Sequence, residues 1–155
     1  GHQMVEMIRE HEKISKKDAW NKAVEALKLV GIPEAEKRMD AYPHELSGGM
    51  LQRAMIAAAI VIRPRLLLLD EPAAGMNPSE TAELMENIRR IRDTFQIAIL
   101  LIEHDMNLVM GICEGICVLN YGKVIAKGSP ADIKANPTVI EAYLGKKGAK
   151  DDAEG

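Results

Sequence analysis

Two short, wholly apolar runs in this sequence, each followed by acidic residues, leave few possible folds for the chain. Residues 66–69 are all leucine and are followed by Asp70 and Glu71, and residues 97–102 are followed by the acidic segment 103–105. A continuous apolar run of this length is typical of a buried strand. We therefore predict two buried strands whose carboxyl ends carry charged side chains.

A helix is predicted between the two strands. Asn77 is a suitable N-cap, Pro78 occupies the first helical position and Glu80 the third. The apolar stripe of this helix consists of Leu84, Ile88 and Ile91. Strand, helix and strand in this order, with both strands fully apolar, are typical of a parallel sheet that is covered on both faces. The sequence therefore predicts an α/β fold.

The segments on either side of this unit have different patterns. Residues 1–46 show helical patterns without a strand, and one helix is expected to begin at Ser15, with Asp18 three residues later. Residues 116–119 and 123–126, separated by Asn-Tyr-Gly, are typical of a β-hairpin. We expect this hairpin to add antiparallel edge strands to the parallel sheet.

Composition excludes several classes of protein. With 155 residues, of which 47% are hydrophobic and 28% charged, the chain is long enough for one globular domain with an apolar core. Its longest apolar run, residues 54–62, is about half as long as a membrane-spanning helix requires. A formal net charge of -3 argues against a nucleic acid as the main partner. Two cysteines cannot form a disulfide framework, so we expect a reducing, cytoplasmic setting.

One candidate site lies where the mostly apolar helix after residue 47 begins. Ser47, Gly48 and Gly49 stand at its N-terminus, where free N–H groups and the positive end of the helix dipole favour an anion such as phosphate. Glycine lets a ligand approach the backbone closely. The alternative is an ordinary serine cap with a flexible entry loop.

A second candidate site lies at the ends of the predicted strands, the edge where open α/β sheets bind ligands. Asp70 can hold Mg²⁺ through coordinated water, and Glu71 can polarise an attacking water as a general base. The alternative is a pair of acids that cap the next loop. His104 can contact a transferring phosphate, or it can be a hydrogen-bonded structural residue.

Three motifs together resemble one family closely. They are LSGGMLQR at residues 46–53, LLLLDEP at residues 66–72 and IEHD at residues 102–105. In this order and spacing they are similar to the motifs of the ATP-binding cassette ATPases, the motor subunits of ABC transporters. The resemblance extends over nearly all of the chain, up to Gly145.

Two branches of that family are represented in the resemblance. Residues 3–60 look like the ATPases of oligopeptide importers, whereas the chain from Pro64 onwards looks like the ATPases of branched-chain amino acid importers. The two resemblances meet in the helix of the signature motif. Both an engineered chimera and a natural divergent sequence remain open.

The resemblance implies a nucleotide contact for the first candidate site. Ser47, Gly48 and Gly49, together with Gln52, correspond to the family's signature loop. In the family, each ATP lies between the Walker A side of one subunit and the signature loop of the other. The signature loop of this chain would therefore contact ATP held mainly by a second subunit.

The resemblance also implies roles at the strand ends. Asp70 would end the Walker B strand and hold Mg²⁺, Glu71 would be the catalytic glutamate, and His104 would be the switch histidine. The segment 73–77 falls where the family has a loop that contacts the second subunit. That loop commonly carries Asp where this chain has Asn77, a departure that leaves the role of Asn77 open.

One motif of the family is missing from the sequence. A phosphate-cradling loop requires G-x-x-x-x-G-K-[ST], and no such string occurs. The chain looks like a helical subdomain followed by the C-terminal half of a P-loop NTPase parallel sheet with antiparallel edge strands. We expect the helical subdomain, ending in the signature helix, over residues 1–63, the Walker B half of the nucleotide-binding core over 64–145, and a disordered tail over 146–155.

The resemblance predicts a fragment of an ABC importer ATPase that couples ATP hydrolysis to uptake of peptides or amino acids, with ATP and Mg²⁺ as cofactors of the complete parent. Without Walker A we expect negligible ATPase activity for the chain alone. We also expect an exposed apolar face and self-association. The alternative is a non-catalytic association module. An ABC-type ATPase of DNA repair or translation is disfavoured, because no basic stripe or long coiled-coil insertion occurs.

The expected partners follow from the same resemblance. They are transmembrane permease subunits and either a second ATPase subunit or a second copy of this chain, with no nucleic acid. The expected location is cytoplasmic, peripheral to the inner face of the plasma membrane.

Overall fold

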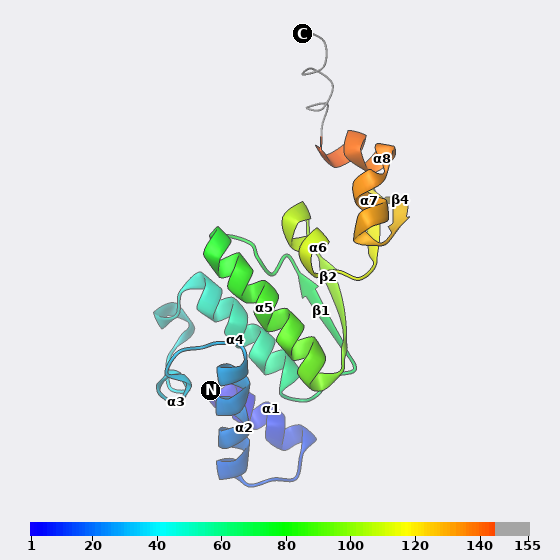
Figure 1. Cartoon of the computed structure of the whole chain (residues 1–155). Helices are drawn as coiled ribbons and strands as arrows, with labels where there is room; N and C mark the ends of the chain where they lie inside the picture. The colour runs from blue at the N-terminus through cyan, green and yellow to red at the C-terminus, as the bar shows by residue number, and fades with distance from the viewer. Residues whose placement is uncertain (145–155) are drawn as a thin grey trace. The chain divides into compact units, whose positions relative to one another are not determined.

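The computed structural model describes residues 1–144 and confirms the α/β fold (Figure 1). The chain divides into two compact units, Gly1–His104 and Asp105–Gly155. The boundary predicted after residue 63 lies inside the first unit and stays a prediction, and the tail predicted to be disordered, 146–155, lies outside the described residues. In the described part of the chain, every helix is too short or too polar to cross a lipid bilayer.

The first unit begins with helices, and the described chain has no strand before residue 66, as predicted. The helices are α1 (His2–His11), α2 (Lys16–Leu29), α3 (Ala35–Arg38), the 3-10 helix η1 (Pro43–Glu45) and α4 (Gly48–Ile60). Ser15 Oγ accepts a hydrogen bond from Asp18 N at 3.1 Å, which confirms the predicted start of α2. Both α1 and α4 pack against α2.

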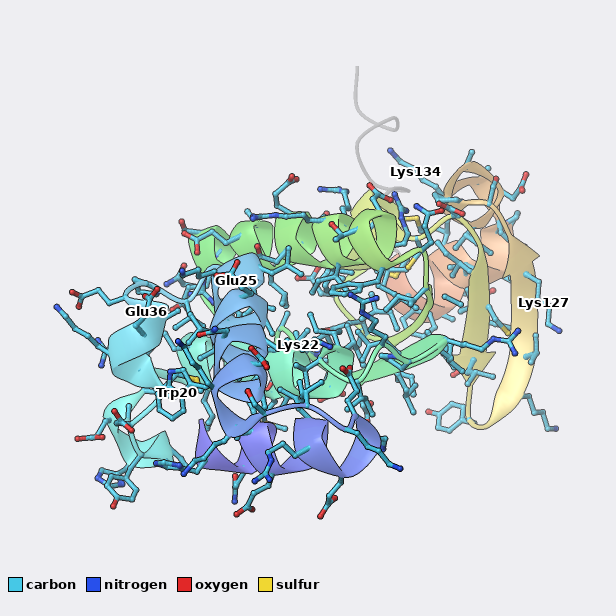
Figure 2. The ribbon with its side chains drawn as sticks, turned by 90° about the horizontal axis from the view of Figure 1, so that it is seen from below. Trp20, Lys22, Glu25, Glu36, Lys127 and Lys134 are labelled. Atoms are coloured by element: carbon cyan, nitrogen blue, oxygen red, sulfur yellow. The ribbon has the colours of Figure 1, made fainter. Side chains whose placement is uncertain are left out.

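Charged side chains stand on the solvent side of α2 and α3, where Figure 2 labels Glu25 and Glu36. Lys28 Nζ lies 3.1 Å from Glu25 Oε1 and 2.7 Å from Glu36 Oε1, which links the two helices. The hydrogen bond from Lys28 lowers the pKa of the Glu36 carboxyl. Because exposed ion pairs contribute little to stability, the packing of α2 rests on buried apolar residues such as Leu27.

The predicted strand, helix and strand are present. β1 (Leu66–Asp70) and β2 (Ala98–Ile102) are parallel, with Leu66 opposite Ala98 and Asp70 opposite Ile102. The connection between them contains α5 (Pro78–Phe95), which runs beside the strands in Figure 1. Parallel pairing brings the carboxyl ends of both strands to one edge of the sheet.

One face of this sheet is open, so the prediction that both faces are covered is wrong for the described chain. Along β1, Leu67 and Leu69 are buried, whereas Leu68 is 57% exposed. A single crossover helix covers only one face of a strand pair, which leaves the other to solvent. The exposed apolar face that we expected is therefore confirmed. We call it the open face, and it consists of Leu66, Leu68, Leu100 and Ile102.

The second unit has its own small core. Its elements are α6 (Met106–Ile112), β3 (Ile116–Asn120), β4 (Lys123–Gly128), α7 (Pro130–Ala135), α8 (Pro137–Val139) and the π-helical turn η2 (Ile140–Leu144). The buried residues Val118 and Ala126 on the strands pack with Ile133 on α7 and Val139 on α8. Side-chain caps at Ser129 and Asn136 begin the two last α-helices.

The strands of the second unit form the predicted β-hairpin. Tyr121 and Gly122 make its two-residue turn, with left-handed φ values of 46° and 75°. Among residues 1–144, β3 and β4 pair only with each other, so the expectation that they extend the parallel sheet as edge strands is wrong. A tight turn lets the two strands satisfy each other's backbone groups locally, and no third strand is needed.

Candidate functional site

The structure brings three predicted site residues together at the carboxyl ends of β1 and β2. Asp70 is the last residue of β1, Glu71 follows it, and His104 lies two residues beyond β2. Glu71 Oε1 lies 3.4 Å from His104 Nδ1. The Glu71 and His104 side chains are both more than half exposed, and Asp70 is exposed as well, so the three groups are accessible to a ligand.

The backbone at Glu71 is held in an uncommon conformation. Its φ of 43° lies in the left-handed region, which costs a non-glycine residue about 1–2 kcal/mol. Two hydrogen bonds keep this conformation, because Glu71 N donates to Ile102 O at 2.9 Å and Glu71 O accepts from Ala74 N at 3.1 Å. The first of these bonds ties the end of β1 to the end of β2. Such a conformation persists where the surrounding structure holds it in place.

Glu103 is a member of this cluster that the sequence reasoning did not single out. Its side chain is only 2% exposed, although its neighbours Ile102 and His104 point outward. Glu103 Oε1 accepts a hydrogen bond from Ala73 N at 3.1 Å, and Oε2 accepts one from His104 N at 3.2 Å. The alternation along a strand was the available signal, since it places residue 103 on the same face as residues 99 and 101.

The loop after Glu71 ends in a complete capping box. Asn77 Oδ1 accepts a hydrogen bond from Glu80 N at 3.0 Å, and Glu80 Oε2 accepts one from Asn77 N at 3.0 Å. The predicted N-cap of α5 is therefore confirmed. The amide oxygen of Asn caps a helix about as well as the carboxylate of Asp does. A contact of residues 73–77 with a second subunit stays a prediction.

The other candidate site lies at the start of α4. Ser47 Oγ accepts a hydrogen bond from Met50 N at 3.3 Å, so the serine is an N-cap. Gly48 has open space around its Cα, whereas a Cβ added to Gly49 would lie 3.4 Å from Glu80 Oε1. Gln52 is half-buried on the same helix. The geometry is that of the ordinary cap considered as the alternative, and binding of an anion by these residues stays a prediction.

Arg53, which the sequence reasoning did not consider separately, anchors the start of α4. Its side chain is 13% exposed, and Nε donates to Gly49 O at 3.3 Å. Nη1 donates to Gly31 O at 3.3 Å and to Glu83 Oε2 at 3.0 Å. One guanidinium therefore joins the turn after α2, the first turn of α4 and the second turn of α5.

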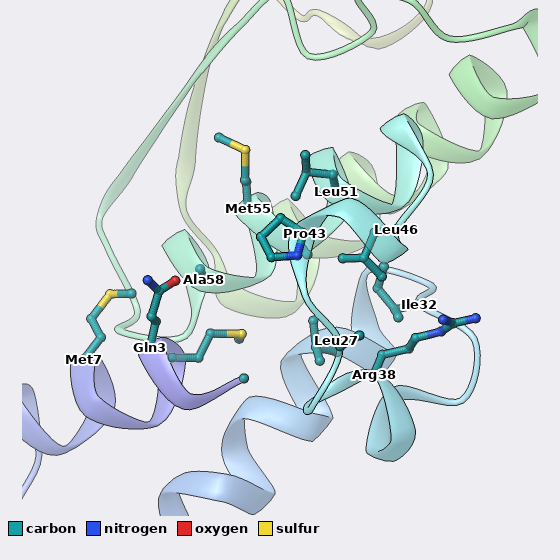
Figure 3. A pocket seen from close by; sticks show the side chains of 14 residues that line it. Gln3, Met7, Leu27, Ile32, Arg38, Pro43, Leu46, Leu51, Met55 and Ala58 are labelled. Carbon is teal, nitrogen blue, oxygen red and sulfur yellow. The ribbon is translucent and has the colours of Figure 1, made fainter.

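A pocket of about 240 Å³ lies elsewhere in the first unit, and Figure 3 shows its lining. Most of the lining is apolar, from α1, α2, α4 and the segment around η1, and includes Met7, Leu27 and Met55. Arg38 also lines the pocket, and its Nε is buried without a hydrogen-bond partner in the described chain. None of the predicted site residues lines this pocket.

Comparisons with family models agree with the motifs. A model described as "ABC transporter" matches residues 2–74. A model described as "Branched-chain amino acid ATP-binding cassette transporter" matches residues 123–149.

Curated relatives of two kinds align with most of the chain. The oligopeptide transport ATP-binding protein OppD of Salmonella typhimurium is 39% identical over 88% of this chain and 41% of its own length. The high-affinity branched-chain amino acid transport ATP-binding protein LivG of the same species is 46% identical over 83% of this chain and 49% of its own length. The chain thus spans less than half the length of these relatives.

Solved structures show the same fold. The ADP conformation of MJ1267, an ATP-binding cassette of an ABC transporter, superposes with a TM-score of 0.70 and 26% identity, covering 81% of this chain and 50% of that one. The cbiO1 protein of Clostridium perfringens, part of the ABC transporter complex cbiONQ, has a TM-score of 0.70 and 31% identity, covering 83% of this chain and 50% of that one.

Proposed function

The chain belongs to the family of ABC transporter ATPases, and from that premise we propose that it forms part of an importer ATPase that couples ATP hydrolysis to uptake of peptides or amino acids. The observation that carries the proposal is the pair of Glu71 and His104, 3.4 Å apart at the ends of adjacent parallel strands and next to Asp70. The names of the relatives, which are peptide and branched-chain amino acid transport proteins, support these two substrate classes.

Each residue of the strand-end cluster has a role in this proposal. Glu71 accepts a proton from, or polarises, the water that attacks the terminal phosphate. His104 contacts the transferring phosphoryl group. Because phosphoryl transfer depends mainly on positioning and on charge stabilisation, two groups held close together at one sheet edge suit this chemistry.

The donor set at the strand end also fits Mg²⁺. Asp70 is exposed, and its carboxylate has no hydrogen-bond or ion-pair partner within residues 1–144. Mg²⁺ in nucleotide sites is held by one or two carboxylates together with water and substrate phosphates, so this single side chain is sufficient from the protein. The ion would neutralise charge on the phosphates. Asp70 would orient it, directly or through water.

We propose that the start of α4 serves a facing subunit. Ser47, Gly48 and Gly49, with Gln52, would contact the phosphates of ATP held by a second ATPase subunit. The exposure of Ser47 and Gly48 and the open space beside Gly48 support this role.

The phosphate-cradling loop would come from another segment or another chain, because the string G-x-x-x-x-G-K-[ST] does not occur in this sequence. We therefore expect negligible ATPase activity from these 155 residues alone. Calorimetry at millimolar Mg-ATP is expected to show no binding heat. Binding at micromolar ATP would contradict this expectation.

The catalytic role is tested by assembly with a second polypeptide. The 155-residue chain is mixed with the part of LivG to which it does not align, about half of that protein, and ATP hydrolysis is compared with that of each component. We expect activity only in the mixture, and a loss of about 100-fold or more for Glu71→Gln, since a general base contributes about 10²–10⁴. Glu6→Gln, an exposed residue of α1, is the matched control. An active Glu71→Gln mixture would contradict the assignment.

A second candidate function is supported by the open face. A non-catalytic association module would bury Leu66, Leu68, Leu100 and Ile102 against another chain. Sedimentation over a range of concentrations is expected to show self-association that Leu68→Lys weakens and Glu71→Gln leaves unchanged. A chain that stays monomeric at every concentration would contradict association. If association occurs but the LivG mixture never hydrolyses ATP, the association module is favoured over the ATPase.

The proposed partners of the assembled ATPase are transmembrane permease subunits, and its proposed place is the cytoplasmic face of the plasma membrane. Co-fractionation with membranes is expected only when permease subunits of a peptide or branched-chain amino acid importer are co-expressed. Whether the two kinds of relative reflect a chimera stays open, because OppD and LivG both align with more than four fifths of the chain.

A further inference from the structure

Glu103 is a buried carboxylate in a place where a strand pattern normally places an apolar side chain. Residues 99, 101 and 103 share one face, and the Glu103 side chain is 2% exposed. Burying an ionised carboxylate is costly unless hydrogen bonds replace its water. Here each oxygen receives one backbone donor, Ala73 N at 3.1 Å and His104 N at 3.2 Å. Such a costly arrangement requires an explanation beyond packing.

The two donors belong to the two segments that carry the chemistry. Ala73 lies two residues after Glu71, and His104 is the other member of the pair. Glu103 therefore forms a bridge from the loop after β1 to the backbone of His104. Together with the bond from Glu71 N to Ile102 O, it connects the two strand ends at two points. A left-handed Glu71 needs this kind of support from its surroundings.

The Glu103 carboxylate also lies near the imidazole of His104. Its Oε2 lies 4.0 Å from His104 Nδ1, and Glu71 Oε1 lies 3.4 Å from the same nitrogen. Two carboxylates facing Nδ1 favour a proton on that nitrogen when the ring is neutral. Nε2 is then the ring nitrogen left for a ligand.

We propose that Glu103 is a positioning residue: its buried carboxylate holds the loop after Glu71 against the end of β2 and, together with Glu71, favours the Nδ1–H form of His104. It does not touch the substrate and acts through Glu71 and His104. The functional meaning of this inference rests on the proposed ATPase role of the pair. The arrangement itself can be tested in the chain without nucleotide, so a failure here is distinguishable from a failure of the proposed function.

The test is the tautomer of His104, read from long-range ¹H–¹⁵N spectra of the 155-residue chain. The spectra are recorded at a pH where the ¹⁵N shifts of the ring no longer change with pH, so that the ring is neutral. We expect mainly Nδ1–H in the unmodified chain. In Glu103→Gln, which keeps the shape but removes the charge and one acceptor, we expect a larger share of Nε2–H, the form an imidazole prefers in water, because only Glu71 then faces Nδ1 as a carboxylate.

Two control variants test whether a change of the His104 tautomer results from the loss of the Glu103 carboxylate or from a general loss of structure. Glu6→Gln makes the same chemical change on an exposed site, and Asn77→Ala removes the cap of α5 without touching Glu103. Both are expected to leave the Nδ1–H form unchanged. The proposal is overturned if the unmodified chain shows mainly Nε2–H, or if Glu103→Gln leaves the ratio of the two tautomers as it was.

A second measurement does not require any variant to fold. Scalar couplings across hydrogen bonds join an amide ¹⁵N to the ¹³C of the accepting carboxylate. In the unmodified chain we expect such couplings from Ala73 and from His104 to Glu103 Cδ. Absence of both couplings would overturn the proposed bridge even if Glu103→Gln cannot be prepared.

Discussion

The two candidate sites differ in how their residues come together. At the strand ends, side-chain atoms of Glu71 and His104 lie 3.4 Å apart, although the whole of α5 separates the two residues in the chain. At the start of α4, the residues Ser47, Gly48 and Gly49 are consecutive in the chain. The first cluster depends on the pairing of β1 with β2 and on a buried carboxylate. The second depends on one serine cap and on the anchor from Arg53. Different substitutions are therefore expected to disrupt the two clusters.

The largest stability effect is expected from the crossover helix that the strand-end cluster requires. Leu84 of α5 is fully buried, so Leu84→Ala should lower the free energy of unfolding of the first unit by about 2–5 kcal/mol. Trp20, the single tryptophan, lies in α2 and reports on this unit in urea titrations followed by fluorescence. Leu84→Met, which conserves volume, should cost less than about 1.5 kcal/mol. A loss below about 1 kcal/mol for Leu84→Ala would mean that α5 does not hold the unit together.

A smaller loss of stability is expected at the start of α4, where the serine cap involves only residues close together in the chain. Ser47→Ala removes the acceptor for Met50 N and should cost about 1 kcal/mol, whereas Ser47→Gly should cost only a few tenths. Ser79→Ala, at an exposed position of α5 where the serine is not the N-cap, is the matched control. The same tryptophan fluorescence measures all three variants. Equal losses for Ser47→Ala and Ser79→Ala would show that the cap contributes nothing.

The smallest expected effect is a pH dependence of the stability of the second unit, where the capping box of α7 contains the charged side chain of Asp132. Hydrogen bonds from the Ser129 hydroxyl and backbone N–H lower the pKa of Asp132. A lowered pKa stabilises the folded unit above the ordinary aspartate pKa of about 3.9, and this contribution is lost as the pH falls below it.

Asp132→Asn should therefore show a smaller shift in urea midpoint between about pH 7 and about pH 3 than the unmodified chain, because it lacks this titration. Amide signals of Ile133 and Val139, in the core of the second unit, follow its unfolding. An identical shift in both proteins would contradict the assigned role of Asp132.

The elements that could be predicted from sequence are those with local causes. The caps at Ser15 and Asn77 and the turn at Tyr121 and Gly122 involve residues within a few positions of one another, and the structure has them as predicted. The parallel pairing of residues 66–69 with their partners was also predictable, because continuous apolar strands around a helix have few alternative arrangements.

The elements that could not be predicted depend on distant partners. Glutamate is usually exposed, and the burial of Glu103 is possible only because Ala73 N, on another segment, donates to it. The hydrogen bonds from Arg53 to Gly31 O and Glu83 Oε2 likewise depend on the packing of α2, α4 and α5. The same reason explains why the hairpin could be predicted but its lack of strand pairing with β1 and β2 could not.

Periodicity, capping and short strings of residues were enough to predict the α/β class, the order of its elements and the similarity to ABC ATPases. Only the folded chain brings Glu71 and His104 together, places the Glu103 carboxylate between the two segments and leaves one apolar face open. The two sets of features differ in how far apart in the chain the interacting groups lie. Caps and turns are satisfied by neighbours in the chain, whereas the burial of a charge and the covering of a sheet depend on which distant groups come to lie beside them.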